Sequence, residues 1–378
     1  MKVLLLGGTG AMGVALAPIL INQGYDVYIT TRSNRVSNNE HLIYVQGDAH
    51  NTTFLKETLR NSFDAVVDFM SYTSNEFQSR VELLLNNTKQ YIFLSSSRVY
   101  NSTPIITEKS PRLLDSINDN DYLKTDEYAL AKAREEDLLL KSDRQNWTII
   151  RPYVTYNDNR LQLTILEKDM WLDRAFRGKK ILYFDQFSNH EATMTHGHDV
   201  AKLMSFIICN SNAYGQIYHV TTDEHHSWKY IFKEYCRDIE EVTGNKPRVV
   251  ISHSDKDLSN FGRISGRTWQ IKYDRLFDRI FDNSKITEQA NSDFSFIPMK
   301  QGFKTCIGNY YEQCKQDESA CQILDYKIEG FLDRLTREKE PLSSIAGTKD
   351  RIKYFAFRYL PVSFCERLAD YLANRRKR

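Results

Sequence analysis

The sequence predicts an α/β protein whose first half forms a doubly wound parallel sheet, followed by a smaller C-terminal substrate lobe and a helical C-terminal extension. Three observations support this class. Short apolar runs alternate with segments of helical period, a glycine-rich turn joins the first run to the first helix, and the last thirty residues combine aromatic with basic side chains. Such alternation implies parallel strands joined by right-handed crossovers.

Six runs rich in Val, Ile, Phe and Tyr are expected as strands buried on both faces. They cover residues 2–7, 25–31, 42–46, 65–70, 90–95 and 147–152. Between them, residues 11–24 and 75–87 have the period of helices, and Gly24 ends the first. Ligands of such sheets bind outside the carboxyl ends of the strands, so functional residues are expected there.

The first strand-to-helix turn is GGTGAMG. Glycine permits a tight turn and lets backbone amides approach a pyrophosphate, which the positive end of the following helix attracts. We therefore expect dinucleotide binding by the backbone of Gly7, Gly10, Ala11, Met12 and Gly13. The alternative is an ordinary glycine-rich turn, which the position between a strand and a helix disfavours.

The end of the second strand selects between the two nicotinamide dinucleotides. A carboxylate there binds the ribose of NAD, whereas an arginine favours the 2′-phosphate of NADP. The stretch ITTRSNR contains Thr31 and Arg32 and no carboxylate, so NADP is expected and NAD is the alternative. Arg32 can instead point to solvent or stack on adenine. Asp48, after the third strand, either reaches the adenine amino group or begins the next turn.

Tyr128 and Lys132 stand four residues apart in DEYALAKAREE and so share one face of a helix. A free tyrosine is a poor base because its pKa is about 10, but a neighbouring ammonium favours the phenolate. Tyr128 can then remove a hydroxyl proton while a hydride leaves the same carbon for a nicotinamide, and Lys132 can hold the nicotinamide ribose. The same spacing is also typical of an exposed charged helix.

Five elements, in this order, resemble the extended short-chain dehydrogenase/reductase superfamily, of the NAD-dependent epimerase/dehydratase type that acts on nucleotide sugars. They are GGTGAMG, GDA, SSSRVY, YALAK and RPYVTY. The resemblance extends, less specifically, through residues 194–208 and 299–313 and covers about residues 1–315. It implies a Rossmann-type fold, a role in polysaccharide biosynthesis and a homodimer.

The resemblance also implies site residues and a reaction. The catalytic hydroxyl falls on Ser96, three residues before Val99, with Tyr128 as acid or base and Lys132 as its electrostatic partner. A register one residue different would select Ser95 or Ser97 instead, and Ser97 is also a candidate substrate contact. The expected activity is NAD(P)-dependent epimerisation of a nucleotide-activated sugar or sugar alcohol through a transient ketone.

Two departures from the family pattern bear on the reaction. Relatives that remove water carry an acidic pair after the hydroxyl residue, but Ser97 and Arg98 stand here, so a 4,6-dehydratase is disfavoured. A net ketoreductase or dehydrogenase is one alternative to the epimerase. A relative without catalysis, which senses a dinucleotide or binds RNA, is an alternative of another class.

The second departure lies after the last strand, where related enzymes use an R-x-x-N pattern to bind the nucleotide diphosphate and this chain has Arg151 without the asparagine. Thr155, Asn157 and Arg160 are nearby polar candidates for substrate binding, and ordinary loop residues are the alternative. Arg267 is a further candidate because guanidinium groups bind phosphate oxygens bidentately.

Three regions are expected: a dinucleotide-binding Rossmann domain (1–155), a partly interleaved substrate lobe (156–315) and a basic, mainly helical extension (316–378). Residues 349–378 contain nine basic and three acidic side chains. We expect a helical hairpin, broken near Pro361, that packs on the body of its own protomer or of a neighbouring one. Peripheral contact with an anionic membrane is the alternative.

Composition excludes several classes. Lys+Arg 51 against Asp+Glu 49 gives a near-neutral chain, which disfavours general electrostatic binding of nucleic acid. The six cysteines form no C-x-x-C pair, and no apolar stretch is long enough to span a bilayer, so a soluble protein of the reducing cytoplasm is expected. No metal is expected, although His190, His196 and His198 lie close in sequence.

Overall fold

The computed structural model describes residues 1–376 and divides the chain into two compact units. The first unit contains residues 1–157, 193–225 and 279–299. The second contains residues 158–192 and 226–278, together with the chain from residue 300 onward. The segment that we expected as a C-terminal extension therefore lies within the second unit.

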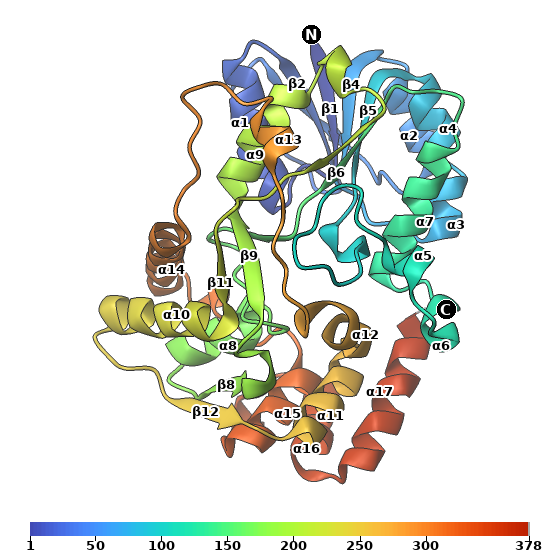
Figure 1. The fold of residues 1–378 in the computed structure, drawn as a ribbon. Helices are drawn as coiled ribbons and strands as arrows, with labels where there is room; N and C mark the ends of the chain where they lie inside the picture. The colour runs from blue at the N-terminus through green and yellow to red at the C-terminus, as the bar shows by residue number, and fades with distance from the viewer. Residues whose placement is uncertain (377–378) are drawn as a thin grey trace. The chain divides into compact units, whose positions relative to one another are not determined.

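The first unit is built on a seven-stranded sheet whose order is β10-β6-β5-β4-β1-β2-β3 (Figure 1). All neighbouring strands are parallel. The strands are β1 (Lys2–Leu6), β2 (Asp26–Thr31), β3 (Leu42–Gln46), β4 (Phe63–Asp68), β5 (Thr88–Leu94), β6 (Trp147–Arg151) and β10 (Gln216–His219). Order and direction confirm the predicted fold class, and only β10 was not predicted as a strand.

Successive residues of the central strands are buried on opposite faces of this sheet, as a period of two requires. In β1, Val3 and Leu5 pack on α1 (Ala11–Asn22) and α9 (Gly197–Ile207). Leu4 and Leu6 belong to a second core. The helices of that second core are α2 (Thr52–Leu59), α3 (Ser74–Gln78), α4 (Val81–Asn86) and α7 (Tyr128–Leu140). Both faces of the sheet are therefore covered by helices (Figure 1).

The single helix expected over residues 75–87 is wrong in one detail, because α3 and α4 are separate. The break lies at Arg80, whose side chain is buried. Its guanidinium donates to the backbone oxygens of Ala49 and His50 at 3.2 and 3.1 Å. Because the buried Arg80 side chain needs these partners, the backbone is held in place at this residue and the helix is interrupted. The apolar periodicity of the sequence does not reveal this break.

The second unit contains a pair of parallel strands, β8 (Ile181–Phe184) and β12 (Val249–Ser252), and most of the remaining helices. Its longer helices are α8 (Lys168–Phe176), α10 (Trp228–Thr243), α11 (Asp255–Ser265), α14 (Met299–Gln316), α15 (Tyr326–Thr336), α16 (Thr348–Tyr359) and α17 (Val362–Arg376). A buried ion cluster holds α15 to the α8–β8 segment: Arg174 and Lys179 both contact Glu329 and Asp333.

Short elements complete the two units. They are β7 (Val154–Tyr156), β9 (Glu191–His196), β11 (His225–Ser227), α5 (Leu113–Ser116), α6 (Asn120–Leu123), α12 (Thr268–Gln270) and α13 (Ser284–Thr287). Within residues 1–376, no helix combines the length and apolar composition that crossing a bilayer requires.

Candidate active site

The glycine turn between β1 and α1 has the geometry that binding of a phosphate requires. Gly7 has a φ of +69°, and a Cβ there would lie 2.8 Å from Met70 Sδ. A Cβ on Gly13 would lie 2.3 Å from the backbone oxygen of Gly8, so glycine is needed for this close approach. Ala11 and Met12 are the first two residues of α1.

Gly10 is the cap residue of α1, and the space beside it is open. No side chain caps this helix, and the nearest atom to a Cβ on Gly10 would be 4.0 Å away. The first turn of α1 therefore presents backbone N–H groups that no capping side chain satisfies, at the positive end of the helix dipole. These features fit the pyrophosphate of a nicotinamide dinucleotide.

Polar residues follow β2 and β3 at the same edge of the sheet. The buried Thr31 hydroxyl donates to the backbone oxygen of Ser33 and accepts its N–H, which shapes the turn. Arg32 is exposed beside it. Asp48 is exposed too, and its Oδ1 accepts the N–H of His50 at 3.0 Å, as the first residue of a turn does. Both interpretations of Asp48 remain compatible with this position.

The three consecutive serines after β5 have different surroundings. Ser95 Oγ donates to Glu136 Oε1 at 2.5 Å, and Ser97 Oγ donates to the backbone oxygen of Arg151 at 2.8 Å. Ser96 Oγ accepts the N–H of Arg98 at 3.2 Å, and its hydroxyl proton has no acceptor among the described residues. The geometry thus favours Ser96 as the reactive hydroxyl. It disfavours Ser97 as a substrate contact, because Ser97 is fully buried and points into the protein.

The segment with these serines lies against the start of α7. Tyr128 is the first residue of α7 and is 39% exposed, and Glu127 caps the helix by accepting the N–H of Ala129 at 2.9 Å. The Arg98 guanidinium lies 5.4 Å from the centre of the Tyr128 ring and bonds Glu127 at 2.6 Å. Arg98 therefore bridges the turn after Ser96 to the start of α7.

Lys132, one turn further along α7, is buried and ion-paired. Its Nζ lies 4.5 Å from the centre of the Phe93 ring and donates to Glu135 Oε2 at 2.9 Å. Burial raises the pKa of the Glu135 carboxyl to about 7, although the Lys132 charge acts in the opposite direction. Glu135 Oε1 has no hydrogen-bond partner, which explains why burial dominates. No sequence pattern indicates this carboxyl.

A second buried carboxyl, Asp68 at the end of β4, lies close to Lys132. It accepts hydrogen bonds from the Tyr72 and Tyr91 hydroxyls, the latter at 2.8 Å, and from the N–H of Met70 at 3.0 Å. Burial raises the pKa of Asp68, and Lys132 lowers it. The Lys132 charge thus acts on two buried carboxyls of the first unit, and burial raises the pKa of both.

Glu136 joins three elements beneath the site. Its carboxylate accepts two hydrogen bonds from Arg151, at 2.8 and 2.6 Å, and others from Ser95 and Arg112. Arg151 also bonds the Tyr100 hydroxyl. This network ties the ends of β5 and β6 to α7, so Arg151 is part of the scaffold. The sequence could not identify Glu136, because its spacing resembles that of other charged residues on the helix.

The remaining substrate candidates fall in both units. In the first, Asn157 is half-buried, while Thr155 is buried with an Oγ1 that has no hydrogen-bond partner. In the second, Arg160 is exposed. Burial lowers the pKa of Arg267, against the charges of nearby carboxylates. These four residues remain predictions.

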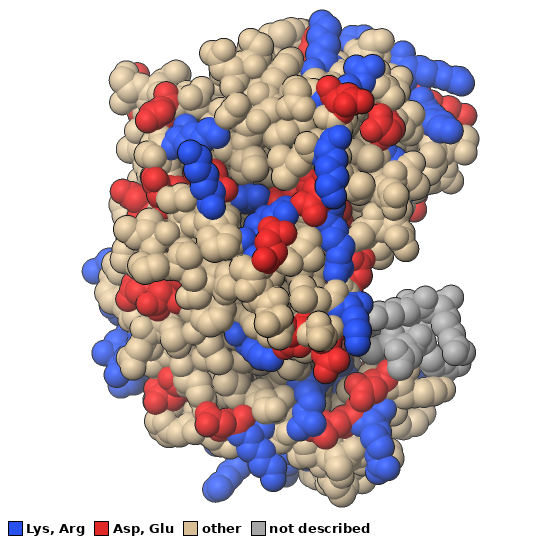
Figure 2. Space-filling view, turned by 45° about the vertical axis from the view of Figure 1, so that its right-hand side comes forward, with Lys and Arg blue, Asp and Glu red and all other residues tan. Residues whose placement is uncertain are grey.

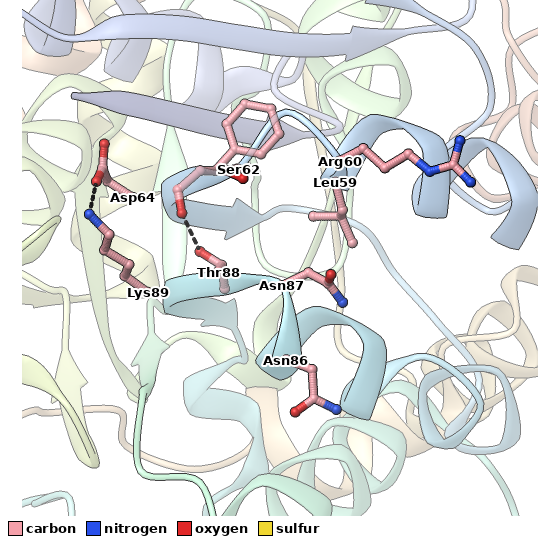
Figure 3. Close-up of a pocket in the computed structure, with 9 residues that line it drawn as sticks. Leu59, Arg60, Ser62, Asp64, Asn86, Asn87, Thr88 and Lys89 are labelled. Atoms are coloured by element: carbon pink, nitrogen blue, oxygen red, sulfur yellow. Dashed lines mark hydrogen bonds and ion pairs between the residues drawn. The ribbon is translucent and has the colours of Figure 1, made fainter.

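A hollow of about 530 Å³ lies at the other edge of the sheet (Figure 3). It is lined by residues 59–60, 62–64 and 86–89, which lie at or before the amino ends of β4 and β5. The Asp64–Lys89 ion pair, at 2.7 Å, crosses part of its wall (Figure 3). This hollow is therefore separate from the candidate active site at the carboxyl ends.

Histidines do not form a metal centre in the part of the chain that the structure describes, where no group of three or more His, Cys, Asp or Glu side chains could hold a metal ion. His196 caps α9 by accepting the N–H of His198 at 3.1 Å. His190 lies 3.4 Å from Asp278.

The doubly wound parallel sheet and the glycine turn define a protein of the Rossmann class. The sequence profile of the NAD dependent epimerase/dehydratase family matches residues 3–221, which is more than half of the chain. The chain belongs to this family, within the extended short-chain dehydrogenase/reductase superfamily.

Solved structures of similar fold include epimerases. UDP-glucuronic acid 4-epimerase from Bacillus cereus, in complex with NAD, is 16% identical, with a TM-score of 0.61 over 85% of this chain and 99% of that one. The epimerase Mth375 from Methanothermobacter thermautotrophicus is 14% identical, with a TM-score of 0.63 over 83% of this chain and 93% of that one. At these identities the likeness concerns the fold.

One relative matches this chain by sequence. Chloroplast stem-loop binding protein of 41 kDa b from Arabidopsis thaliana is 22% identical over 278 residues, which is 69% of this chain and 68% of that protein.

Proposed function

We propose that the protein is an NAD(P)-dependent epimerase of a nucleotide-activated sugar or sugar alcohol. One sugar hydroxyl would be oxidised to a ketone and reduced again from the other face, so one centre inverts without net redox change. One observation carries this proposal most. Of three consecutive serines, Ser96 alone keeps a hydroxyl proton without an acceptor in the described residues, and Arg98 bridges its turn to Tyr128.

Three side chains would share the work at the reacting carbon. The glycine turn from Gly7 to Gly13 would hold NAD(P), which when bound would supply reversible hydride transfer at this carbon. Ser96 would donate a hydrogen bond to the reacting oxygen, and Tyr128 would take up and return its proton. Lys132 would supply a positive charge that favours the Tyr128 phenolate. A charged Glu135 carboxylate, which Lys132 contacts, would weaken this effect.

We further propose NADP as the preferred cofactor. The support is the residue type after β2, where the exposed Arg32 follows Thr31 and no carboxylate is present up to Arg35. The relatives solved with NAD do not decide this preference, because they are below 25% identical. The B. cereus relative has also been solved with UDP-glucuronic acid, which supports a nucleotide sugar as the substrate class here.

Two other reactions belong to the same family. A 4,6-dehydratase is disfavoured because neither of the two residues after Ser96 supplies an acid. Ser97 is buried and donates a hydrogen bond to the backbone oxygen of Arg151, and Arg98 is paired with Glu127. A net ketoreductase or dehydrogenase would use the same three residues. It would change the reduced-nicotinamide absorbance stoichiometrically with substrate, whereas an epimerase would leave it unchanged.

Stem-loop RNA binding is a second candidate function, and the Arabidopsis relative is the observation that favours it. It predicts a mobility shift of a stem-loop RNA that does not depend on the Tyr128 hydroxyl. An unshifted RNA at micromolar protein would exclude this candidate.

The epimerase proposal is tested by supplying NADP and a panel of UDP- and dTDP-sugars and following isomers by NMR. We expect one substrate to convert to an isomer without net NADPH formation, and Tyr128→Phe to reduce the rate by a factor of about 10² or more. Conversion at an equal rate by Tyr128→Phe would overturn the assigned role of Tyr128. Mass spectrometry of nucleotides released on denaturation would identify a copurified cofactor.

A further inference from the structure

The last two helices of the second unit, α16 and α17 (Figure 1), carry large apolar side chains that are exposed. On α16, Ile352 is 62% exposed, Phe355 45% and Tyr359 51%. On α17, Phe364 is 41% exposed and Tyr371 57%. We call these five side chains the aromatic face. The α16 members are spaced three and four residues apart, and the α17 members seven apart, so each set follows one side of its helix.

Folding of the second unit does not require the aromatic face, because other side chains of the same helices already pack inward. Tyr354 and Phe357 of α16 are fully buried. The Tyr354 hydroxyl donates to Asp333 of α15 at 2.7 Å, and Cys365 of α17 is fully buried. A helix that packs on its own protein by one side needs one apolar stripe, yet α16 has a second on the outside.

The charges around the aromatic face are mainly positive. Lys349, Arg351 and Arg367 are exposed on the two helices. Two of the three acidic residues nearby are neutralised locally, Asp350 by Lys353 and Glu366 by Arg263, both at 2.7 Å.

Aromatic and aliphatic side chains flanked by exposed Lys and Arg are the pattern of helices that lie in the interface of an anionic bilayer. Tyrosine rings favour this interface because their polar end stays hydrated while the ring is buried. Each basic residue near an anionic leaflet adds to the attraction.

Two other occupants fit less well. A symmetric contact between two copies would bring the positive surroundings of one face against those of the other, and like charges repel there. Nucleic acid is held chiefly by a strong positive field, whereas the formal net charge of this chain is only +2.

We propose that the aromatic face docks on an anionic lipid surface and holds the protein at a membrane without spanning it. The inner sides of α16 and α17 pack within the second unit, and their outer sides carry the aromatic face. This proposal is independent of the proposed epimerase activity.

The test is co-sedimentation of the full-length protein with vesicles. We expect binding to vesicles of mixed phosphatidylglycerol and phosphatidylcholine to be at least about tenfold tighter than to phosphatidylcholine alone, and to weaken in 1 M NaCl. The triple variant Ile352→Ser, Phe355→Ser, Tyr359→Ser should bind at least about tenfold more weakly. Leu324→Ser is the matched control, because Leu324 is 76% exposed in the same unit but outside α16 and α17.

A second variant, Lys349→Glu with Arg351→Glu and Arg367→Glu, should lose the preference for anionic vesicles while its circular dichroism stays native. The proposal is overturned if the wild type does not sediment with anionic vesicles, or if the triple serine variant binds as well as Leu324→Ser. It is also overturned if the serine substitutions leave vesicle binding unchanged and instead abolish either a dimer or the binding of a stem-loop RNA.

Discussion

Neighbouring residues of the same type have different hydrogen bonds at the candidate site, and we propose different roles for them on that ground. Ser95 and Ser97 are bound to Glu136 and to the Arg151 backbone, whereas Ser96 keeps its proton free of any described acceptor. The resemblance in sequence selected Ser96 but left the register open by one residue. Only the orientation of each side chain separates the three, and no sequence pattern specifies it.

Substitution of the serines should therefore affect activity differently. Ser96→Ala should lower kcat by a factor of about 10² and cost about 1 kcal/mol of stability, because the Arg98 N–H loses its acceptor. Ser97→Ala should cost about 1 kcal/mol of stability, because it removes a buried hydrogen bond, and should change kcat little. Steady-state kinetics and denaturant unfolding of both variants check this. Equal losses of kcat in the two variants would contradict the assignment.

Glu135 should make stability depend on pH. Burial raises the pKa of this carboxyl from 4.5 to about 7, so between these values the folded protein holds a proton that the unfolded chain has lost. The carboxyl therefore lowers stability progressively as the pH rises through this window, by up to ~3 kcal/mol. Glu135→Gln cannot titrate, and its amide oxygen can still accept a hydrogen bond from Lys132.

The free energy of unfolding of Glu135→Gln should accordingly increase relative to that of the wild type as the pH rises from 5 to 8, so the variant becomes relatively more stable. Urea unfolding of both proteins at several pH values measures this difference, in which the titration of all other groups largely cancels. A difference that stays constant, or that moves in the opposite direction, would show that the pKa of Glu135 is not raised.

At the scale of elements, apolar periodicity was sufficient for most of the sheet. It predicted β1 to β6 within about two residues, because their strands are buried on both faces and read as apolar runs. It missed β10, whose four residues QIYH are too short and too polar to give a pattern. It also missed the break at Arg80 and the Glu136–Arg151 network, since both depend on contacts between residues far apart in sequence.

The packing of α15 on α16 depends on one glycine. A Cβ on Gly330 would lie 2.6 Å from the backbone oxygen of Tyr354, and a backbone atom cannot move aside easily. Gly330→Ala should destabilise the second unit by about 1–3 kcal/mol. Gly308→Ala, in α14, is the matched control. Its Cβ would meet only Val242 at 3.9 Å, so higher helix propensity should make it neutral or slightly stabilising.

Thermal and urea unfolding of both alanine variants compare the two sites directly. If Gly330→Ala were as stable as Gly308→Ala, α15 and α16 would not approach each other as closely as the structure describes.

At the scale of the whole molecule, charge sets few constraints on function. The formal net charge is +2, and the two signs are intermixed on the face that Figure 2 shows. The family and the fold follow from the sequence and are confirmed by the matching profile and the sheet order. The sugar, the carbon altered and the second unit's substrate contacts do not follow, because side chains of separate segments determine them.

The central claim is that a nicotinamide dinucleotide binds at the glycine turn, and Gly10 offers the most direct test. Its φ of −82° and ψ of −179° suit any residue, and its Cβ position is open, so Gly10→Val should fold at a cost below about 1 kcal/mol. The valine would occupy the space that a pyrophosphate needs.

Isothermal titration calorimetry with NADPH and NADH should show binding to the wild type and to Gly308→Ala, tighter for NADPH, and a loss of at least about tenfold in Gly10→Val. No binding of either dinucleotide to the wild type, or equal affinity in Gly10→Val, would contradict the claim.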